Sequence, residues 1–454
     1  MADTAQISQK FEQASKGAAA SFFWLSAFYV VYCIRPEDWL HFLARIPLAK
    51  ITAIGALLAF FFGTAAGKRK FRDLPRESHY LLAMIGVFIL SSVLSPVWRG
   101  GALNNTLNFA KVYVAWVLTF LLVTNLKRFR RIVFIQAGAV PAICILSILK
   151  SRSHPRLDGA LGGIYSNPND LAFAIVLSLP FCLMFLLTAR GAFRKLVWAI
   201  AMLAMAAALV LTASRGGFIT LIVAGAVCLW HFGVKGKRVY LIAASALVVV
   251  ILIAVAGGPL KSRFASTLSD DDADTTQAAS AHASYENRKY LMSRAIEGIE
   301  HYPILGIGPM NFMVYSLDWH EVHMTYLEIA VEGGFPSLLL YLLFFSCGFR
   351  NLHLVMKRKD LGPDLKLFAW ALHSSLVGFI VGALFSPEAY QFFPYFAVAY
   401  TSVLFALAQE GDRLKSPAPS PVVPRSTSVT AVKQPGYREP QPQHVLFRRP
   451  ILDK

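Results

Sequence analysis

The sequence predicts an all-α membrane protein, a polytopic bundle of about twelve transmembrane helices with one long loop on the outer side. Of the 454 residues, 56% are hydrophobic and only 15% are charged, whereas charged residues make up about 25% of an average soluble domain. Apolar windows of roughly 17 to 25 residues, long enough to cross the hydrocarbon core of a bilayer, recur along the whole chain. Most of the net charge of +18 lies in short segments between these windows.

The twelve expected spans are continuous apolar runs that lack the alternation of a membrane β-barrel. Because backbone polar groups find no water in lipid, each run should be an α-helix. No small-residue cleavage pattern follows the first run, so we expect it to be retained rather than removed as a signal peptide. The expected spans are residues 17–34, 51–66, 80–94, 107–124, 132–149, 171–188, 196–213, 218–230, 239–256, 326–348, 365–385 and 392–408.

The distribution of Lys and Arg predicts the orientation. With the N-terminus inside, 30 of the 44 basic residues fall in cytoplasmic segments, as the positive-inside rule requires. We therefore expect a bacterial inner-membrane protein with both termini in the cytoplasm, and the basic charge does not call for nucleic acid as a partner. The expected division is 1–16 as cytoplasmic N-terminus, 17–256 as spans one to nine, 257–322 as periplasmic loop, 323–410 as spans ten to twelve and 411–454 as disordered cytoplasmic tail.

The outer loop at 257–322 falls into two parts. Residues 269–284 (SDDDADTTQAASAHAS) are polar, so we expect them to be mobile. From Tyr285 onward, apolar residues recur at helical spacing, which predicts an amphipathic helix on the membrane surface. These apolar residues are Tyr290, Leu291, Ala295, Ile296 and Ile299.

The five cysteines lie in or at the end of apolar windows, without CxxC spacing and outside the polar loop. Disulfides and a thiolate metal site are therefore not expected.

Ser214-Arg215-Gly216-Gly217 interrupts a stretch, 196–230, that is otherwise free of charge. Its 35 residues are too many for one span and predict two helices joined by a tight turn at the outer face. The glycines would permit the turn and leave backbone N–H groups open. An arginine at this depth needs a partner, and its guanidinium fork suits a phosphate. The alternative is an arginine that snorkels from a helix end.

A second basic group follows in the outer loop, at Arg288, Lys289 and Arg294. Around a helix, Arg288 and Arg294 are about 240° apart, so one helix cannot direct all three side chains at one ligand. Arg288, expected at the start of the helix beside free N–H groups, is the better candidate for binding an anion. An ordinary basic helix at the membrane interface is the alternative.

His320 and His323 precede the span at 326–348. Two histidines three residues apart could bind a metal, but no third ligand follows at helical spacing, so a metal is not expected. His323, at the mouth of a span and near water, could act as a general base. The alternative is an interfacial histidine without a chemical role.

Three further features suggest structural roles first. Asp170 closes an outer turn and is expected to cap the following span. Lys111 lies inside an apolar window, where it could face the bundle interior or snorkel. The segment Arg35-Pro36-Glu37-Asp38-Trp39 is expected to be an outer loop with an interfacial Trp anchor.

Three strings together resemble the O-antigen ligase and polymerase superfamily of bacterial envelope assembly: TASRGGFI at 212–219, ENRKYLMSRAIEGIEHYPILGIGPMNF at 286–312 and HMTYLEIAVEGGFPSLLLYL at 323–342. Their order and spacing agree with the family over about 167–345. In addition, IRPEDW at 34–39 resembles a subgroup of O-glycosylation ligases associated with exosortase systems.

The resemblance implies a glycosyltransferase of the GT-C type whose donor is a glycan on undecaprenyl pyrophosphate, with no cofactor and no metal. By position, the family's turn arginine corresponds to Arg215, its loop arginine to Arg288 and its loop-end histidine to His323. Arg294, Lys289 and Tyr326 are secondary candidates for the same site. Many members have Asn after the histidine where this chain has Met324, so a role for that amide is not expected here.

Three functions remain open from the sequence. The first is a ligase that moves the glycan to an envelope acceptor, either a lipid A core or a protein hydroxyl, with inversion at the anomeric carbon. The second is a polymerase that joins lipid-linked repeat units. The third is a transporter or flippase, although internal repeats and broken midplane helices, which are typical of transporters, are not evident.

Overall fold

The computed structural model describes residues 19–40, 42–62, 68–150, 157, 165, 167–251 and 276–415, with the side chains of 276–285 and 411–415 left out. Every regular element within these ranges is helical. The expected cytoplasmic N-terminus at 1–16 lies outside the described residues. So do 257–275 of the expected periplasmic loop and 416–454 of the expected disordered tail.

Nine helical segments in the described part of the chain are long and apolar enough to cross a membrane: Ala19–Trp39, α5 (Arg99–Leu122), α6 (Leu126–Lys150), α7 (Pro168–Thr188), α8 (Ala192–Thr212), α9 with its π-helical end (Arg215–Lys235), α13 (Thr325–Lys357), α14 (Pro363–Gly382) and α15 (Phe392–Lys415). The other three expected spans overlap α3 (Leu48–Phe62), α4 (Arg76–Val93) and a helix at Tyr240–Ile251. The polytopic helix bundle is confirmed, whereas the count of twelve and the GT-C type stay predictions.

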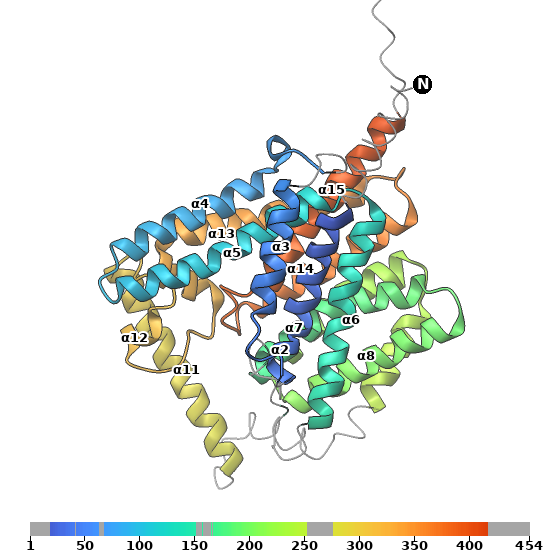
Figure 1. The fold of residues 1–454 in the computed structure, drawn as a ribbon. Helices are drawn as coiled ribbons and strands as arrows, with labels where there is room; N and C mark the ends of the chain where they lie inside the picture. The colour runs from blue at the N-terminus through green and yellow to red at the C-terminus, as the bar shows by residue number, and fades with distance from the viewer. Residues whose placement is uncertain are drawn as a thin grey trace, which may run out of the picture. The chain divides into compact units, whose positions relative to one another are not determined.

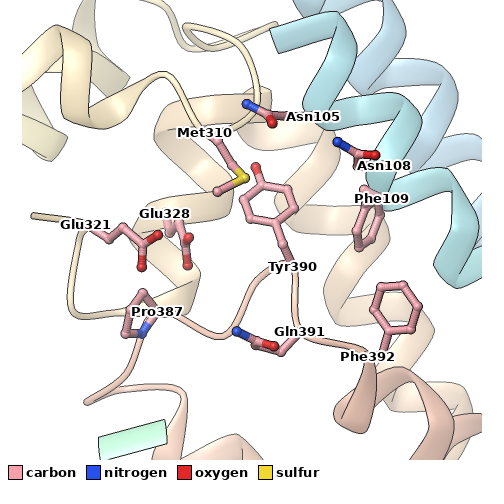
Figure 2. Close-up of a pocket in the computed structure, with 10 residues that line it drawn as sticks. All are labelled: Asn105, Asn108, Phe109, Met310, Glu321, Glu328, Pro387, Tyr390, Gln391 and Phe392. Carbon is pink, nitrogen blue, oxygen red and sulfur yellow. The ribbon is translucent and has the colours of Figure 1, made fainter. Parts of the chain in front are cut away.

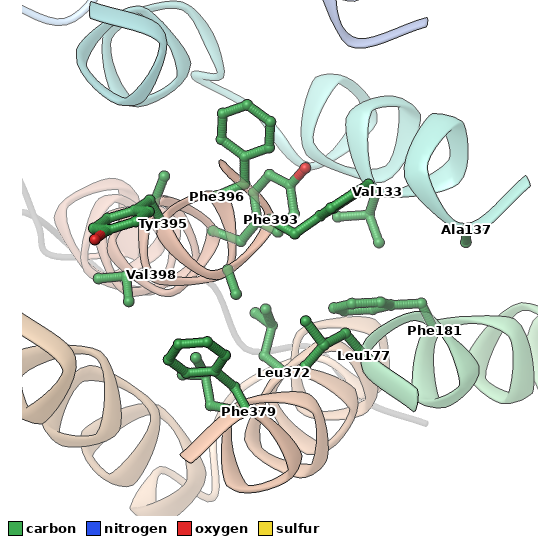
Figure 3. Close-up of a cluster of buried hydrophobic side chains, with 14 of the residues drawn as sticks. Val133, Ala137, Leu177, Phe181, Leu372, Phe379, Phe393, Tyr395, Phe396 and Val398 are labelled. Atoms are coloured by element: carbon green, nitrogen blue, oxygen red, sulfur yellow. The ribbon is translucent and has the colours of Figure 1, made fainter. Parts of the chain in front are cut away.

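The long helices pack in two groups. Helix α4 lies along α13 and α5, and these three run side by side in Figure 1. Helix α7 contacts α6, α8, α9 and α14. Side chains of α15 fill the space beside α6, α7 and α14, where Phe393 and Phe396 lie near Val133, Leu177 and Leu372 (Figure 3). All five cysteines are free.

Buried polar contacts join the helices at the end of the bundle that carries Arg69, called here the Arg69 end. Arg69 Nη1 donates to the carbonyls of Phe120 and Val123, both at 2.8 Å, and its Nε pairs with Glu410 at 3.0 Å. Glu77, in the first turn of α4 and before the expected span at 80–94, is buried, and it accepts a hydrogen bond from Asn351 at 2.8 Å. Such contacts satisfy polar groups that lipid cannot.

Helix α13 is broken at Gly334, so the expected uninterrupted span at 326–348 is wrong in this detail. Gly334 has φ 72° and ψ 176°, a conformation that only glycine adopts readily. The break frees the carbonyls of Val331 and Glu332, which accept the N–H groups of Ile307 and Gly308 at 2.9 Å each. The loop after α11 is thereby fixed to the beginning of α13.

Helix α11 (Thr276–His301) covers this loop, and α12 (Phe312–Ser316) follows it (Figure 1). The expected amphipathic helix is present but begins well before Tyr285. Its buried stripe packs on protein: Leu291 and Ala295 join a small core with Ile307, Phe312, Val322 and Val331. Tyr290 and Ile296 stay exposed. The stripe therefore helps to hold α11 against α13.

We predict that Gly334→Ala destabilises the protein. A Cβ atom there would lie 2.1 Å from the Ile304 carbonyl oxygen, and the left-handed backbone adds about 1–2 kcal/mol of strain. Gly225→Ala is the matched control, because a Cβ at Gly225 meets nothing within 4 Å. Thermal unfolding in detergent should show a clearly lower Tm for Gly334→Ala alone. Equal Tm values would contradict this account of the break.

Candidate functional site

The beginnings of α7 and α9 are tied together by their capping residues. Ser214 caps α9 by accepting the N–H of Gly217 at 3.1 Å, and its hydroxyl lies 2.7 Å from Asn169 Oδ1 in α7. Asn167, rather than the expected Asp170, caps α7 through the N–H of Asn169 at 2.9 Å. This end of the bundle, where α13 also begins, is called here the His323 end.

The turn before Arg215 is formed differently from the expectation. Its left-handed residue is Ala213, with φ 49°, so the glycines are not needed for the turn itself. They are needed for packing: a Cβ on Gly216 would lie 2.8 Å from Phe385 Cβ, and one on Gly217 would lie 2.7 Å from Ala172 Cβ. The two glycines bring the first turn of α9, with Arg215 exposed upon it, close to its neighbours.

Arg288 and Arg215 lie within electrostatic reach of each other. Burial, followed by the positive charge of Arg215, lowers the pKa of the Arg288 guanidinium. The Nε atom of Arg288 is buried and has no hydrogen-bond partner among the described residues. Because α11 begins at Thr276, Arg288 lies inside the helix and not at its start, so the expected help from free N–H groups is not available.

Neither Arg215 nor Arg288 makes an ion pair within the described residues. Other arginines in those ranges do, as Arg35 with Asp38 at 2.6 Å and Arg130 with Asp364 at 3.3 Å illustrate. These two positive charges, one of them half-buried, lie within electrostatic reach of each other and have no counter-charge among the described residues. Such a pair is suited to bind an anion with several oxygens.

His323 lies within electrostatic reach of Arg288, and its ring orientation is fixed. Its Nδ1 lies 2.9 Å from the carbonyl oxygen of Glu321, and a carbonyl can only accept, so Nδ1 carries the proton and Nε2 presents its lone pair. Burial lowers the pKa of His323 below 6.5, and the charges of Arg288 and His320 lower it further, against the hydrogen bond to Glu321. The neutral ring is therefore the prevailing form at pH 7.

The secondary candidates do not join Arg215, Arg288 and His323. Arg294 pairs with Glu297, and its guanidinium lies over the Tyr315 ring, 5.0 Å from the centroid. Lys289 is exposed. Tyr326 donates to the Ile380 carbonyl at 2.8 Å and so ties α13 to α14. His320 is exposed and pairs with Asp318 at 2.5 Å.

The structure contains a cavity that sequence reasoning missed. Its volume is about 250 Å³, and it lies between α5, the loop before α13 and the loop between α14 and α15 (Figure 2). The lining residues are Asn105, Asn108, Phe109, Met310, Glu321, Glu328, Pro387, Tyr390, Gln391 and Phe392. Glu321 belongs to both places, since its side chain lines the cavity and its backbone carbonyl holds His323.

Two hydrogen-bonded junctions fix the cavity walls. Thr325 N donates to the Ala383 carbonyl at 2.8 Å, and Thr325 Oγ1 accepts the Glu388 N–H at 2.9 Å. Glu332 accepts the Met310 N–H at 2.7 Å and also the Tyr390 hydroxyl. Glu328 accepts the Ala389 N–H, and the Glu388 carboxyl accepts the Ser386 hydroxyl. Glu328, Glu332 and Glu388 therefore all have partners within the protein. Within the described residues, no group of three His, Cys, Asp or Glu side chains is arranged to hold a metal ion.

A family of known proteins is similar to the part of the chain that contains these residues. Residues 200–342, which contain Arg215, Arg288, Glu321 and His323, match the family model for O-antigen ligase. No curated protein matches the chain. The members of this family are glycosyltransferase-like ligases and polymerases. Residues 200–342 of this chain are therefore similar to the O-antigen ligase family.

Proposed function

We propose that this protein transfers a glycan from undecaprenyl pyrophosphate to a hydroxyl of an envelope acceptor, on the outer side of the inner membrane. The proposal is carried by two guanidinium groups, Arg215 and Arg288, that lie within electrostatic reach of each other and have no counter-charge among the described residues. The neutral imidazole of His323 is within electrostatic reach of Arg288. The two arginines bind an anion, and His323 accepts a proton.

The arginine pair suits the leaving group. As the glycosyl bond breaks, negative charge develops on the lipid pyrophosphate, and fixed positive groups at that point lower the barrier. Arg215 and Arg288 supply this charge from the protein itself. Their mutual repulsion, which lowers the pKa of Arg288, would be relieved when the pyrophosphate is bound between them.

His323 suits the nucleophile. The acceptor oxygen forms a bond to the anomeric carbon while the carbon–oxygen bond to the pyrophosphate breaks and its electron pair leaves with the phosphate. The hydroxyl proton passes to Nε2 of His323, whose Nδ1 stays bound to the Glu321 carbonyl. A positioned base contributes about 10² to 10⁴ in rate. One displacement of this kind inverts the anomeric configuration.

The membrane side follows from charge. The segments expected to be cytoplasmic include Arg69, Arg130 and Arg358, whose contacts join helix ends away from Arg215 and His323. The positive-inside rule places that end in the cytoplasm, so we place the His323 end in the periplasm. The acceptor, lipid A core or protein, is what separates ligase from polymerase.

The direct test is turnover by the full-length protein in lipid vesicles with a labelled undecaprenyl-pyrophosphate glycan. We expect release of undecaprenyl pyrophosphate with His320→Ala and no detectable release with His323→Ala, because only His323 would receive the proton. Movement of intact donor across the bilayer without release would indicate a transporter instead. Equal turnover by the two variants would remove His323 from the mechanism.

We predict that Arg215→Lys loses at least about a hundredfold in kcat/KM, although the charge is kept, because a lysine cannot make the two-pronged contact of a guanidinium. Arg194→Lys, an exposed arginine of α8, is the matched control and should keep full activity. Activity of Arg215→Lys near that of the control would show that Arg215 does not contact the pyrophosphate.

The pH dependence follows from the base. His323 must be neutral to accept a proton, and its pKa is lowered from 6.5 by burial and by Arg288. Activity should therefore rise with pH through a midpoint below 6.5 and be level at pH 7. The measurement is kcat/KM of the wild-type protein between pH 4.5 and 8. A midpoint above 7 would contradict the assignment.

A further inference from the structure

We propose that the cavity lined by Asn105, Glu321 and Gln391 is a subsite for an uncharged sugar ring of the glycan substrate. This inference deepens the proposed function and rests on it, because it assumes that the molecule handled at His323 is a glycan. It adds a place for the sugar beside the place already argued for the pyrophosphate.

The first support is a set of polar side chains without protein partners. Within the described residues, neither the Asn105 nor the Gln391 amide makes a hydrogen bond, and the Glu321 carboxyl makes neither a hydrogen bond nor an ion pair. All three are partly buried and line the same cavity (Figure 2). The neighbouring Glu328, Glu332 and Glu388 differ, because each is engaged in a contact with the protein. Amides and a carboxyl group offer both donors and acceptors, as ring hydroxyls require.

The second support is the apolar part of the lining. Phe109, Tyr390 and Phe392 contribute aromatic rings to the walls (Figure 2). Aromatic faces carry partial negative charge, so they accommodate the C–H groups on the flat face of a sugar ring. A volume of about 250 Å³ is below that of typical pockets for drug-sized ligands, about 300–1,000 Å³. The cavity therefore suits one small polar unit rather than an extended chain.

The third support is charge. Asp170 and Glu388 lie within electrostatic reach of Glu321. Wherever these carboxyl groups ionise, their negative charge beside the cavity repels phosphate and uronate groups, whereas neutral hydroxyls are accepted. The positive pair at Arg215 and Arg288 has the opposite preference. The two places would thus separate the sugar from the pyrophosphate by charge.

Glu321 connects the sugar subsite to the base. Its backbone carbonyl fixes Nδ1 of His323 at 2.9 Å while its side chain faces the cavity. A sugar seated in the cavity is therefore next to the segment that orients the imidazole. This makes Asn105, Gln391 and Glu321 specificity-determining residues rather than catalytic ones.

The test is saturation-transfer NMR on the full-length protein in lipid nanodiscs, with glucose and N-acetylglucosamine as neutral probes and glucuronate as the anionic probe. We expect binding of the neutral sugars and at least tenfold weaker binding of glucuronate. The double variant Asn105→Ala/Gln391→Ala should bind the neutral sugars about tenfold less well, since it loses two hydrogen bonds. Asn104→Ala, an exposed neighbour on α5 outside the cavity lining, is the matched control and should bind as wild type.

Three results would overturn the proposal: no binding of neutral sugars, equal affinity for glucuronate and glucose, or equal affinity of the double variant and Asn104→Ala. Because neither replaced amide bonds to the protein, the Tm of the double variant should stay at that of Asn104→Ala, which separates lost binding from lost folding. Arg215→Lys should bind the neutral sugars as wild type does. Sugar binding without donor turnover would therefore count against the proposed function and not against the subsite.

Discussion

The proposed site depends on the repulsion between two guanidinium groups, Arg215 and Arg288, that no described residue neutralises. Arg288 is half-buried, and its Nε has no partner in the described part of the chain. Burial lowers the pKa of its guanidinium, and the charge of Arg215 lowers it further. Holding like charges together costs free energy, and the fold offsets that cost elsewhere through packing. An anion with several oxygens would convert the repulsion into attraction, so we propose that the site is selective for a doubly or multiply charged group.

The surrounding structure keeps these charges in place. Ser214 caps α9 and contacts Asn169 at 2.7 Å. These two contacts of Ser214 hold the turn that carries Arg215. Arg288 is held because the buried stripe of α11 packs on the beginning of α13, and the break at Gly334 lets the loop before α12 bond to α13. Local features that look like irregularities in a membrane helix therefore serve to position groups from three distant segments.

Much of the fold could be predicted from the sequence because apolar length and the positions of Lys and Arg are local signals. Each of the twelve expected spans overlaps a helix. The helix break at Gly334 and the burial of Glu77 were missed, since both depend on which segments pack together.

Arg215, Arg288 and His323 were selected by family resemblance, and the structure brings them within electrostatic reach. The cavity could not be predicted, because Asn105, Glu321 and Gln391 lie far apart in the chain and share no motif. Hydrophobic spacing predicted the part of α11 from Tyr285 onward but not its earlier start at Thr276. It could not predict what the stripe packs on, since an apolar stripe fits lipid and protein equally well.

The account is tested most directly by an experimental structure of the full-length protein with undecaprenyl pyrophosphate bound. It predicts that the pyrophosphate oxygens contact both Arg215 and Arg288, with Nε2 of His323 facing the position of the anomeric carbon. A pyrophosphate that contacts neither arginine, or that lies at the Arg69 end of the bundle, would contradict it.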